Sequence, residues 1–244
     1  WLAESMMQSQ PESNHLLVAY DMRGHGKTVG PADLEIDKLV DDARFILNYY
    51  MRHFEGSEVN YFLVGHSLGG SVVSRLGTTA DFKDNLAGIV VIDIVEEAAL
   101  QALVHMPAVL ARRPRQFAST EDAVEWALKS GTCKSREVAE ISFLSQYHEA
   151  TNGGPEMIVD LRASETCWTG WFTGLSQTFL ALPCPRMLVL AETDYLDRTL
   201  LVGQMQGKFW LEVVRGTGHA IQEDQPKKLA DLTRSFIDHF TRKT

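Results

Sequence analysis

The 244-residue chain has few cysteines, few basic residues relative to acidic ones, and no long apolar run. Its cysteines, Cys133, Cys167 and Cys184, follow no CxxC or Cys/His spacing, so the sequence supports neither a disulfide framework nor a zinc site. The net charge of -9 has the wrong sign for binding nucleic acid or an anionic membrane. No apolar run approaches the roughly 18 residues that a membrane span requires. We therefore expect reduced thiols, no metal, and a location in the cytoplasm or nucleus.

The chain is rich in apolar, strand-like runs that alternate with amphipathic helical segments. The apolar runs predict strands at 16–20, 61–64, 88–95, 187–191 and 209–214. Periodic apolar positions predict helices over 36–50, from about Leu68, and from Pro226 through Phe240. Continuous apolar strands that alternate with helices indicate an α/β fold with a mostly parallel sheet and helices on both faces. We expect one such domain over 1–244.

The segment between Val95 and Arg186 interrupts this alternation with helical patterns. They lie at 98–110, at 136–147, and after Ser119-Thr120-Glu121-Asp122, which has the character of a capped helix start. Connections of this length without a role are uncommon. The sequence therefore predicts a helical lid insertion over the strand ends, at approximately 96–185.

Tryptophans in the expected lid have two alternative roles. Trp126 and Trp171 could line a pocket for a substrate or partner. The alternative is that they pack the lid onto the body of the domain.

The segment Gly65-His66-Ser67-Leu68-Gly69 fits the pattern G-x-S-x-G between a predicted strand and a predicted helix. A sharp turn there would lift Ser67 clear of the sheet, and glycines are needed because a Cβ would strike the neighbouring strand or helix. The first N–H groups of the helix would face a developing oxyanion, and we expect the Leu68 N–H to be a donor. The pattern predicts that Ser67 is a nucleophile.

A serine nucleophile needs a base, and the base needs a carboxylate. His219, in the glycine-flanked loop between the last predicted strand and the last helix, is the predicted base. His66 and His25 are expected to have structural roles. For the acid, Asp93 and Asp194 each follow a predicted strand, and spacing alone leaves both possible.

Longer motifs resemble known families. The strand-elbow-helix order, with DMRGHGKT after a strand and GTGH near the end, resembles the α/β-hydrolase superfamily. Across most of the chain, the segments GHSLGGSVV, VVIDIVEEAALQAL, RRPRQFASTEDAVEWALKSG, CWTGWFTGLSQTFL and LDRTLLVGQMQGKF are similar to the protein phosphatase methylesterases. In that family the acid lies in the segment that matches IDIVEE here, so the resemblance implies Asp93 rather than Asp194.

The resemblance also implies a function. The family's enzymes are serine carboxylesterases that remove the methyl ester from the C-terminal leucine of the type-2A protein phosphatase catalytic subunit. They need no metal or organic cofactor. Binding of the phosphatase body would involve the lid and the segment Gly203 to Lys208, with Gln204, Met205 and Lys208 as candidate contacts. An ordinary turn at a helix end is the alternative for that segment.

One feature of the family has no counterpart in this sequence: a glycine-rich loop after an early strand, which supplies a second oxyanion donor. We therefore expect an N-terminally truncated member of the family, with the Leu68 N–H as the remaining donor. Loss of one donor typically costs about 2.7–4 kcal/mol of transition-state stabilisation. An inactive phosphatase-binding module is thus one alternative function, and a generic α/β-hydrolase esterase or lipase is another.

Overall fold

The structure is a computed structural model that describes residues 2–9, 15–28, 33–54, 59–78, 83–151, 153–191 and 196–241. The chain divides into two compact units. The first consists of Trp1–Val18, Glu35–Ala102 and Thr169–Thr244, and the second of Ala19–Leu34 and Leu103–Trp168. The expected insertion at 96–185 thus contributes 103–168 to the second unit, whereas its two ends belong to the first.

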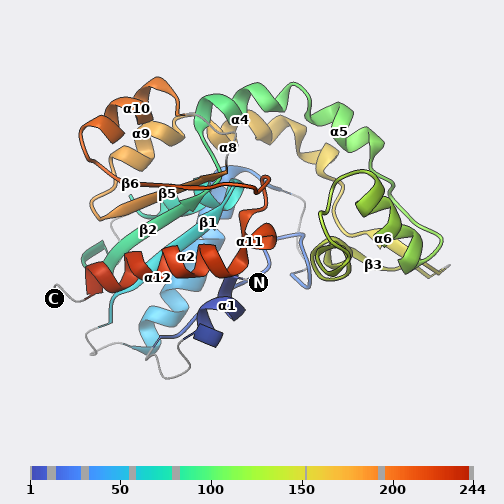
Figure 1. Cartoon of the computed structure of the whole chain (residues 1–244), viewed down its shortest axis with the longest axis horizontal. Coiled ribbons are helices and arrows are strands. Elements are labelled where there is room, and N and C mark those ends of the chain that lie inside the picture. The colour runs from blue at the N-terminus through green and yellow to red at the C-terminus, as the bar shows by residue number, and fades with distance from the viewer. Residues whose placement is uncertain are drawn as a thin grey trace. The chain divides into compact units, whose positions relative to one another are not determined.

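The first unit is built on a four-stranded sheet in the order β1-β2-β5-β6. Its strands are β1 (Tyr61–His66), β2 (Leu86–Ile92), β5 (Arg186–Ala191) and β6 (Trp210–Val214), and every pairing is parallel. The two central strands, β2 and β5, are almost wholly buried, as their continuous apolar sequences predict. Because the strands are parallel, their carboxyl ends meet at one edge of the sheet (Figure 1).

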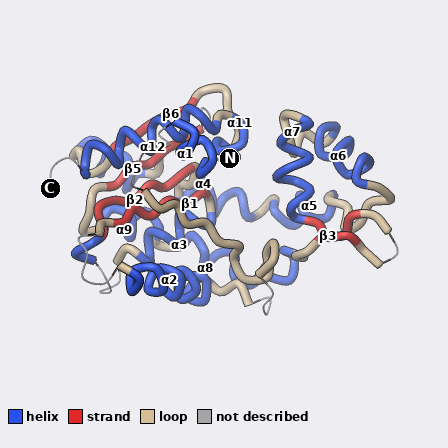
Figure 2. The backbone as a smooth tube through the Cα atoms, turned by 90° about the horizontal axis from the view of Figure 1, so that it is seen from below, coloured by secondary structure: helices blue, strands red, loops and turns tan. Residues whose placement is uncertain are grey.

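Helices cover both faces of this sheet, which confirms the predicted α/β fold. Helices α1 (Leu2–Ser9) and α12 (Pro226–Thr241) lie on one face, and α2 (Ile36–His53) and α3 (Leu68–Leu76) lie on the other (Figure 2). The unit also contains the short turn Lys83–Asn85, α9 (Leu175–Leu180), α10 (Arg198–Met205) and α11 (Ile221–Asp224). Helices α4 (Glu96–Leu103) and α8 (Trp168–Phe172) cross the boundaries with the second unit.

The core under α12 explains why that helix docks on the sheet. Phe236 is fully buried, and its ring lies 6.2 Å from that of Phe62 and 5.5 Å from that of Trp210. Burying an aromatic or large aliphatic side chain stabilises a fold by roughly 1.5–3 kcal/mol. The amphipathic pattern that predicted this helix is therefore the pattern of its contacts with the strands.

The predicted strand at 16–20 is wrong. The described chain offers no strand that pairs with this segment, and Leu16 and Val18 are 60% and 43% exposed. An apolar run becomes a strand only where another strand accepts its backbone hydrogen bonds. Sequence pattern alone carries no information on such a partner.

The second unit is mostly helical. It contains α5 (Met106–Arg112), α6 (Thr120–Lys129) and α7 (Arg136–Val138), and the antiparallel strands β3 (Tyr147–Glu149) and β4 (Pro155–Met157). The predicted helix at 136–147 is only partly right, because α7 gives way to a π-helical turn at Ala139–Phe143 and a 3-10 turn at Leu144–Gln146. A longer 3-10 segment runs over Leu161–Cys167. The second unit contains an aromatic cluster formed by Phe117, Trp126, Phe143 and Tyr147.

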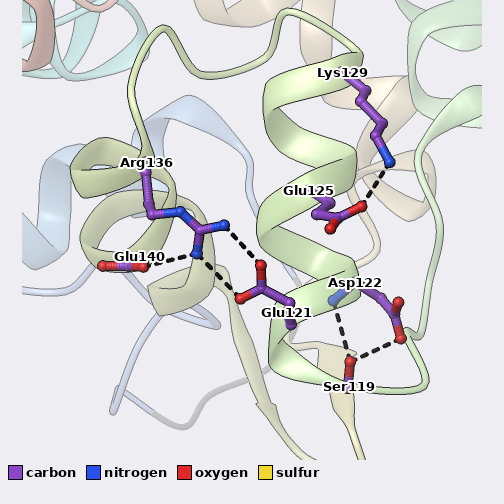
Figure 3. Close-up of polar contacts among 7 residues, drawn as sticks. All are labelled: Ser119, Glu121, Asp122, Glu125, Lys129, Arg136 and Glu140. Atoms are coloured by element: carbon purple, nitrogen blue, oxygen red, sulfur yellow. Dashed lines mark hydrogen bonds and ion pairs between the residues drawn. The ribbon is translucent and has the colours of Figure 1, made fainter.

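The predicted capped start of α6 is confirmed (Figure 3). The Asp122 N–H donates to the Ser119 hydroxyl oxygen at 3.1 Å, a bond that typically stabilises a helix by about 1 kcal/mol. Figure 3 also shows Arg136 paired with Glu121 at 2.7 Å and with Glu140 at 3.2 Å. These pairs are exposed, so each contributes little beyond fixing where the two helices meet.

Within the described ranges, no helix has both the length and the apolar character needed to cross a membrane.

Candidate active site

Ser67 is the single residue between β1 and α3, and its backbone has an unusual conformation. Its φ of 51° and ψ of -119° place it in a region that costs an ordinary residue of the order of 1–3 kcal/mol. The Ser67 N–H donates to the Ile92 carbonyl at 2.9 Å, which fixes the turn against the end of β2. Strain of this kind at a strand–helix junction is typical of functional sites.

Two glycines allow this turn. A Cβ on Gly65 would lie 2.2 Å from the Gly69 carbonyl oxygen, and a Cβ on Gly70 would lie 2.9 Å from a methyl of Val91. Gly65 therefore lets the chain double back tightly, while Gly70 lets α3 approach the sheet. The prediction that a side chain beside Ser67 would strike its neighbours is confirmed at Gly65. The same steric limit applies at Gly70, next to the predicted motif.

Asp93 directly follows β2, and its carboxylate is nearly sealed from solvent. The residue is 4% exposed, has a φ of 53°, and donates its N–H to the Val189 carbonyl at 2.8 Å. One carboxylate oxygen, Oδ1, accepts the Ala191 N–H at 2.8 Å. The other, Oδ2, lies 2.7 Å from Nδ1 of His219. Both oxygens thus have a donor, as a buried carboxylate requires.

His219 lies in the loop between β6 and α11, and several hydrogen bonds shape this loop. The Gly218 N–H donates to Asp224 at 2.6 Å, and the Thr217 hydroxyl donates to the Val214 carbonyl at 2.7 Å. The His219 ring is 60% exposed although its Nδ1 is bound to Asp93. Because a carboxylate accepts hydrogen bonds, Nδ1 carries the proton, and in the neutral ring Nε2 is the basic nitrogen.

Other predicted residues lie in different surroundings. Asp194 falls outside the described residues, and the structure places Asp93 beside His219. Trp171 is buried, and the half-buried Trp126 of the second unit stacks on Phe143. Packing therefore accounts for both tryptophans. By contrast, Gln204 and Met205 at the end of α10 are exposed, and so is Lys208, three residues beyond that helix.

His66 is the residue whose contacts the sequence did not reveal. Its Nε2 lies 2.7 Å from the main-chain oxygen of His219, and the two rings are 4.6 Å apart. Burial, and secondarily the neighbouring His219, lowers the pKa of His66 from 6.5 to about 4. The two histidines are 153 positions apart in the sequence, so no local pattern signals this contact.

The three side chains of His66, Asp93 and His219 bring possible ligand atoms within 4.8 Å of one another. However, Nδ1 of His219 is committed to Asp93, and both ring nitrogens of His66 have partners in His219 and Gln222. An ion at this place would have to break those hydrogen bonds. The arrangement as it stands is suited to moving a proton along an oriented imidazole.

A parallel α/β sheet with a positive-φ serine after one strand, and an Asp–His pair after two others, defines the α/β hydrolases as a class. Residues 1–232 match the family described as "Alpha/beta hydrolase family". A solved E-2-(acetamidomethylene)succinate hydrolase superposes with a TM-score of 0.69 at 23% identity, covering 89% of this chain and 80% of that one. A solved esterase from Mycobacterium tuberculosis superposes with a TM-score of 0.67 at 22% identity, covering 89% of this chain and 73% of that one.

Curated relatives narrow this class. The chain is 39% identical to protein phosphatase methylesterase 1 of Yarrowia lipolytica over 93% of its own length and 54% of the relative. The Schizosaccharomyces pombe protein of that name is also 39% identical, over 90% of this chain and 64% of the relative. The probable protein phosphatase methylesterase 1 of Dictyostelium discoideum is 36% identical, over 92% of this chain and 70% of the relative. The chain belongs to the α/β hydrolase family and, within it, to the protein phosphatase methylesterases. It spans between about half and two thirds of the first two relatives.

Proposed function

We propose that this chain carries the catalytic apparatus of a serine carboxylesterase, which removes the methyl ester from the C-terminal leucine of the type-2A protein phosphatase catalytic subunit. The observation that carries the proposal is the hydrogen bond between His219 and Asp93, made beside the strained turn at Ser67. The names of the curated relatives support the choice of a phosphatase as substrate. The esters of lipids or metabolites have no comparable support.

In the first half of the reaction, the Ser67 hydroxyl oxygen attacks the carbonyl carbon of the methyl ester. His219 Nε2 takes the hydroxyl proton, and the buried Asp93 stabilises the resulting imidazolium through Nδ1–H. The tetrahedral intermediate collapses when the carbon–methoxy bond breaks. His219 returns the proton to the leaving oxygen, which departs as methanol and leaves an acyl-enzyme on Ser67.

In the second half, water attacks the acyl carbon while His219 again accepts a proton. The bond to Ser67 breaks, and the proton passes back to the serine oxygen. The free leucine carboxylate is the product. In both tetrahedral intermediates the oxyanion would accept the N–H of Leu68, because the first N–H groups of a helix have no acceptor within it.

For the body of the phosphatase, we infer a contact surface on the exposed side of α10. Leu201, Val202 and Met205 are exposed apolar residues there, and Met205 is 78% exposed. Gln204 and Lys208 flank them with polar groups. Apolar residues surrounded by polar ones are typical of protein interaction surfaces. Such an enzyme would act where the phosphatase is found, in the cytoplasm or the nucleus.

The test is demethylation of purified, carboxymethylated phosphatase catalytic subunit, followed by mass spectrometry of its C-terminal peptide. The chain should remove the methyl group, and Ser67→Ala should abolish the removal. A Ser71→Ala variant, which alters a buried serine of the same helix, controls for damage to α3. Demethylation by Ser67→Ala at the wild-type rate would overturn the proposal. Binding of the phosphatase without demethylation by the wild type would favour the binding-module alternative.

A further inference from the structure

We propose that His66 is a positioning residue, which holds the main chain of His219 so that the imidazole of His219 stays aligned between Asp93 and the serine turn. The catalytic consequence of this role rests on the proposed function. The structural part does not, because it concerns hydrogen bonds and protonation within the folded chain.

The register of the sheet places His66 for this role. His66 is the last residue of β1 and pairs with Ile92, the last residue of β2, so Asp93 follows immediately on the neighbouring strand. From these adjacent strand ends the two side chains hold different parts of His219. Asp93 binds the ring through Nδ1 at 2.7 Å, and His66 binds the main-chain oxygen at 2.7 Å. The histidine is thereby fixed at its backbone and at its ring, although its side chain is largely exposed.

The partners of His66 define its tautomer. A carbonyl oxygen only accepts hydrogen bonds, so Nε2 of His66 carries the proton. Nδ1 is then an acceptor, and the side-chain amide of Gln222 lies 3.4 Å from it. Gln222 belongs to α11, three residues after His219. The His66 ring therefore holds both ends of the segment from His219 to Gln222. Its Nε2 binds the His219 main chain, and its Nδ1 lies beside the Gln222 side chain.

A neutral His66 is required for this arrangement to serve catalysis. The ring of His219 becomes positively charged when it accepts the serine proton, and a second cation 4.6 Å away would oppose that charge. The titratable groups that act on His66 are His219, which disfavours its protonation, and Asp93, which favours it. Burial outweighs the effect of Asp93 and keeps the pKa of His66 at about 4. His66 therefore stays neutral over the pH range in which a histidine base works.

Two variants separate the hydrogen bond from the space that the ring fills. His66→Gln keeps an N–H donor that can reach the His219 carbonyl, whereas His66→Leu removes the donor and keeps an apolar side chain. Using hydrolysis of a small chromogenic ester, we expect His66→Leu to lower kcat by roughly tenfold to a hundredfold with little change in KM, because misplacement of a catalytic group by about 1 Å can cost that much. His66→Gln should restore most of the rate. Its acid-limb pKa should match that of the wild type, because His66 does not titrate in that range.

A measurement that needs no activity decides the structural part. Nitrogen-15 NMR of the histidine rings in the wild-type chain should show His66 as the Nε2–H tautomer, with no titration above about pH 5. An Nδ1–H tautomer, or a titration near pH 6.5, would overturn the proposal. Equal kcat values for His66→Gln and His66→Leu would also overturn it. If the wild type proves inactive, the proposed function fails, and the NMR result alone decides the role of His66.

Discussion

Asp93 holds His219 with one carboxylate oxygen and the backbone of β5 with the other. Its Oδ2 lies 2.7 Å from Nδ1 of His219, and its Oδ1 accepts the Ala191 N–H at 2.8 Å. The carboxylate therefore cannot rotate without losing a bond to the sheet. Asp93 thereby fixes both the position and the tautomer of His219, although the side chain of His219 is mostly exposed.

The first prediction concerns the acid. Asp93→Asn keeps an oxygen for the Ala191 N–H but can present an amide N–H to His219, which favours the wrong imidazole tautomer. We expect kcat to fall by a factor on the order of 10⁴ with the fold intact. Asp194→Asn, the matched change at the alternative acid, should have a much smaller effect. Steady-state kinetics on one ester substrate compares the two, and the reverse ranking would refute the assignment of Asp93.

The second prediction concerns the turn. Gly65→Ala would place a Cβ 2.2 Å from the Gly69 carbonyl oxygen, so the elbow must shift. We expect a loss of roughly 1–3 kcal/mol in the free energy of unfolding, as overpacked sites typically show. Gly170→Ala is the control, because a Cβ there meets nothing within 4 Å. Urea denaturation of both variants provides the measurement, and equal stabilities would show that the turn tolerates a side chain.

The third prediction concerns stability and pH. The unfolded chain protonates His66 near pH 6.5, whereas the folded chain does so only near pH 4. Between these values the unfolded state binds more protons, so acidification favours unfolding. The stability that depends on a neutral His66 is fully present above about pH 6.5 and is lost progressively down to about pH 4. At 1.36 kcal/mol per pKa unit, the loss in unfolding free energy is at most roughly 3 kcal/mol.

Urea midpoints measured at several pH values across this window test that contribution. His66→Gln should lower the dependence of the unfolding free energy on pH by that amount, since glutamine does not titrate. If His66→Gln leaves the slope unchanged, His66 does not have the lowered pKa described above.

The fourth prediction concerns the surface of α10. Met205→Lys places a charge on a side chain that is 78% exposed, so the free energy of unfolding should change by less than about 0.5 kcal/mol. The KM for the methylated phosphatase should rise fivefold or more, the effect of losing about 1 kcal/mol at an interface. The KM for a small ester should not change. Phe45→Lys, at an exposed residue of α2 outside both the lid and the α10 segment, is the control. Equal KM values for Met205→Lys and wild type on the phosphatase would exclude this surface.

Much of the fold could be predicted from local pattern. The continuous apolar runs of β2 and β5 and the amphipathic repeat of α12 identified those elements, since burial in the first unit follows that pattern. The helix cap at Ser119 could also be predicted, because it joins two residues that are only three positions apart. The prediction at 16–20 was wrong because a strand depends on a partner elsewhere in the chain. The π-helical turn at Ala139–Phe143 was missed for a similar reason, since the residues themselves suit an α-helix.

The candidate site divides in the same way. Ser67 could be found because its glycines, strand and helix are contiguous in sequence. Asp93 and Asp194 could not be separated by spacing, because both follow apolar strands and only the three-dimensional register of β2 and β5 brings Asp93 to His219. For His66 the sequence predicts only a structural role. Its hydrogen bond to the His219 carbonyl joins residues 153 apart, and no local pattern encodes such a contact.

We propose Ser67 as the nucleophile that His219 and Asp93 activate. The decisive experiment is reaction of the chain with a labelled fluorophosphonate, followed by peptide mapping of the adduct. We expect a single adduct on Ser67, no labelling of Ser67→Ala, and labelling of Asp93→Asn that is slower by orders of magnitude. An adduct on another residue would rule out Ser67 as the nucleophile, and labelling of Asp93→Asn at the wild-type rate would rule out the role of Asp93.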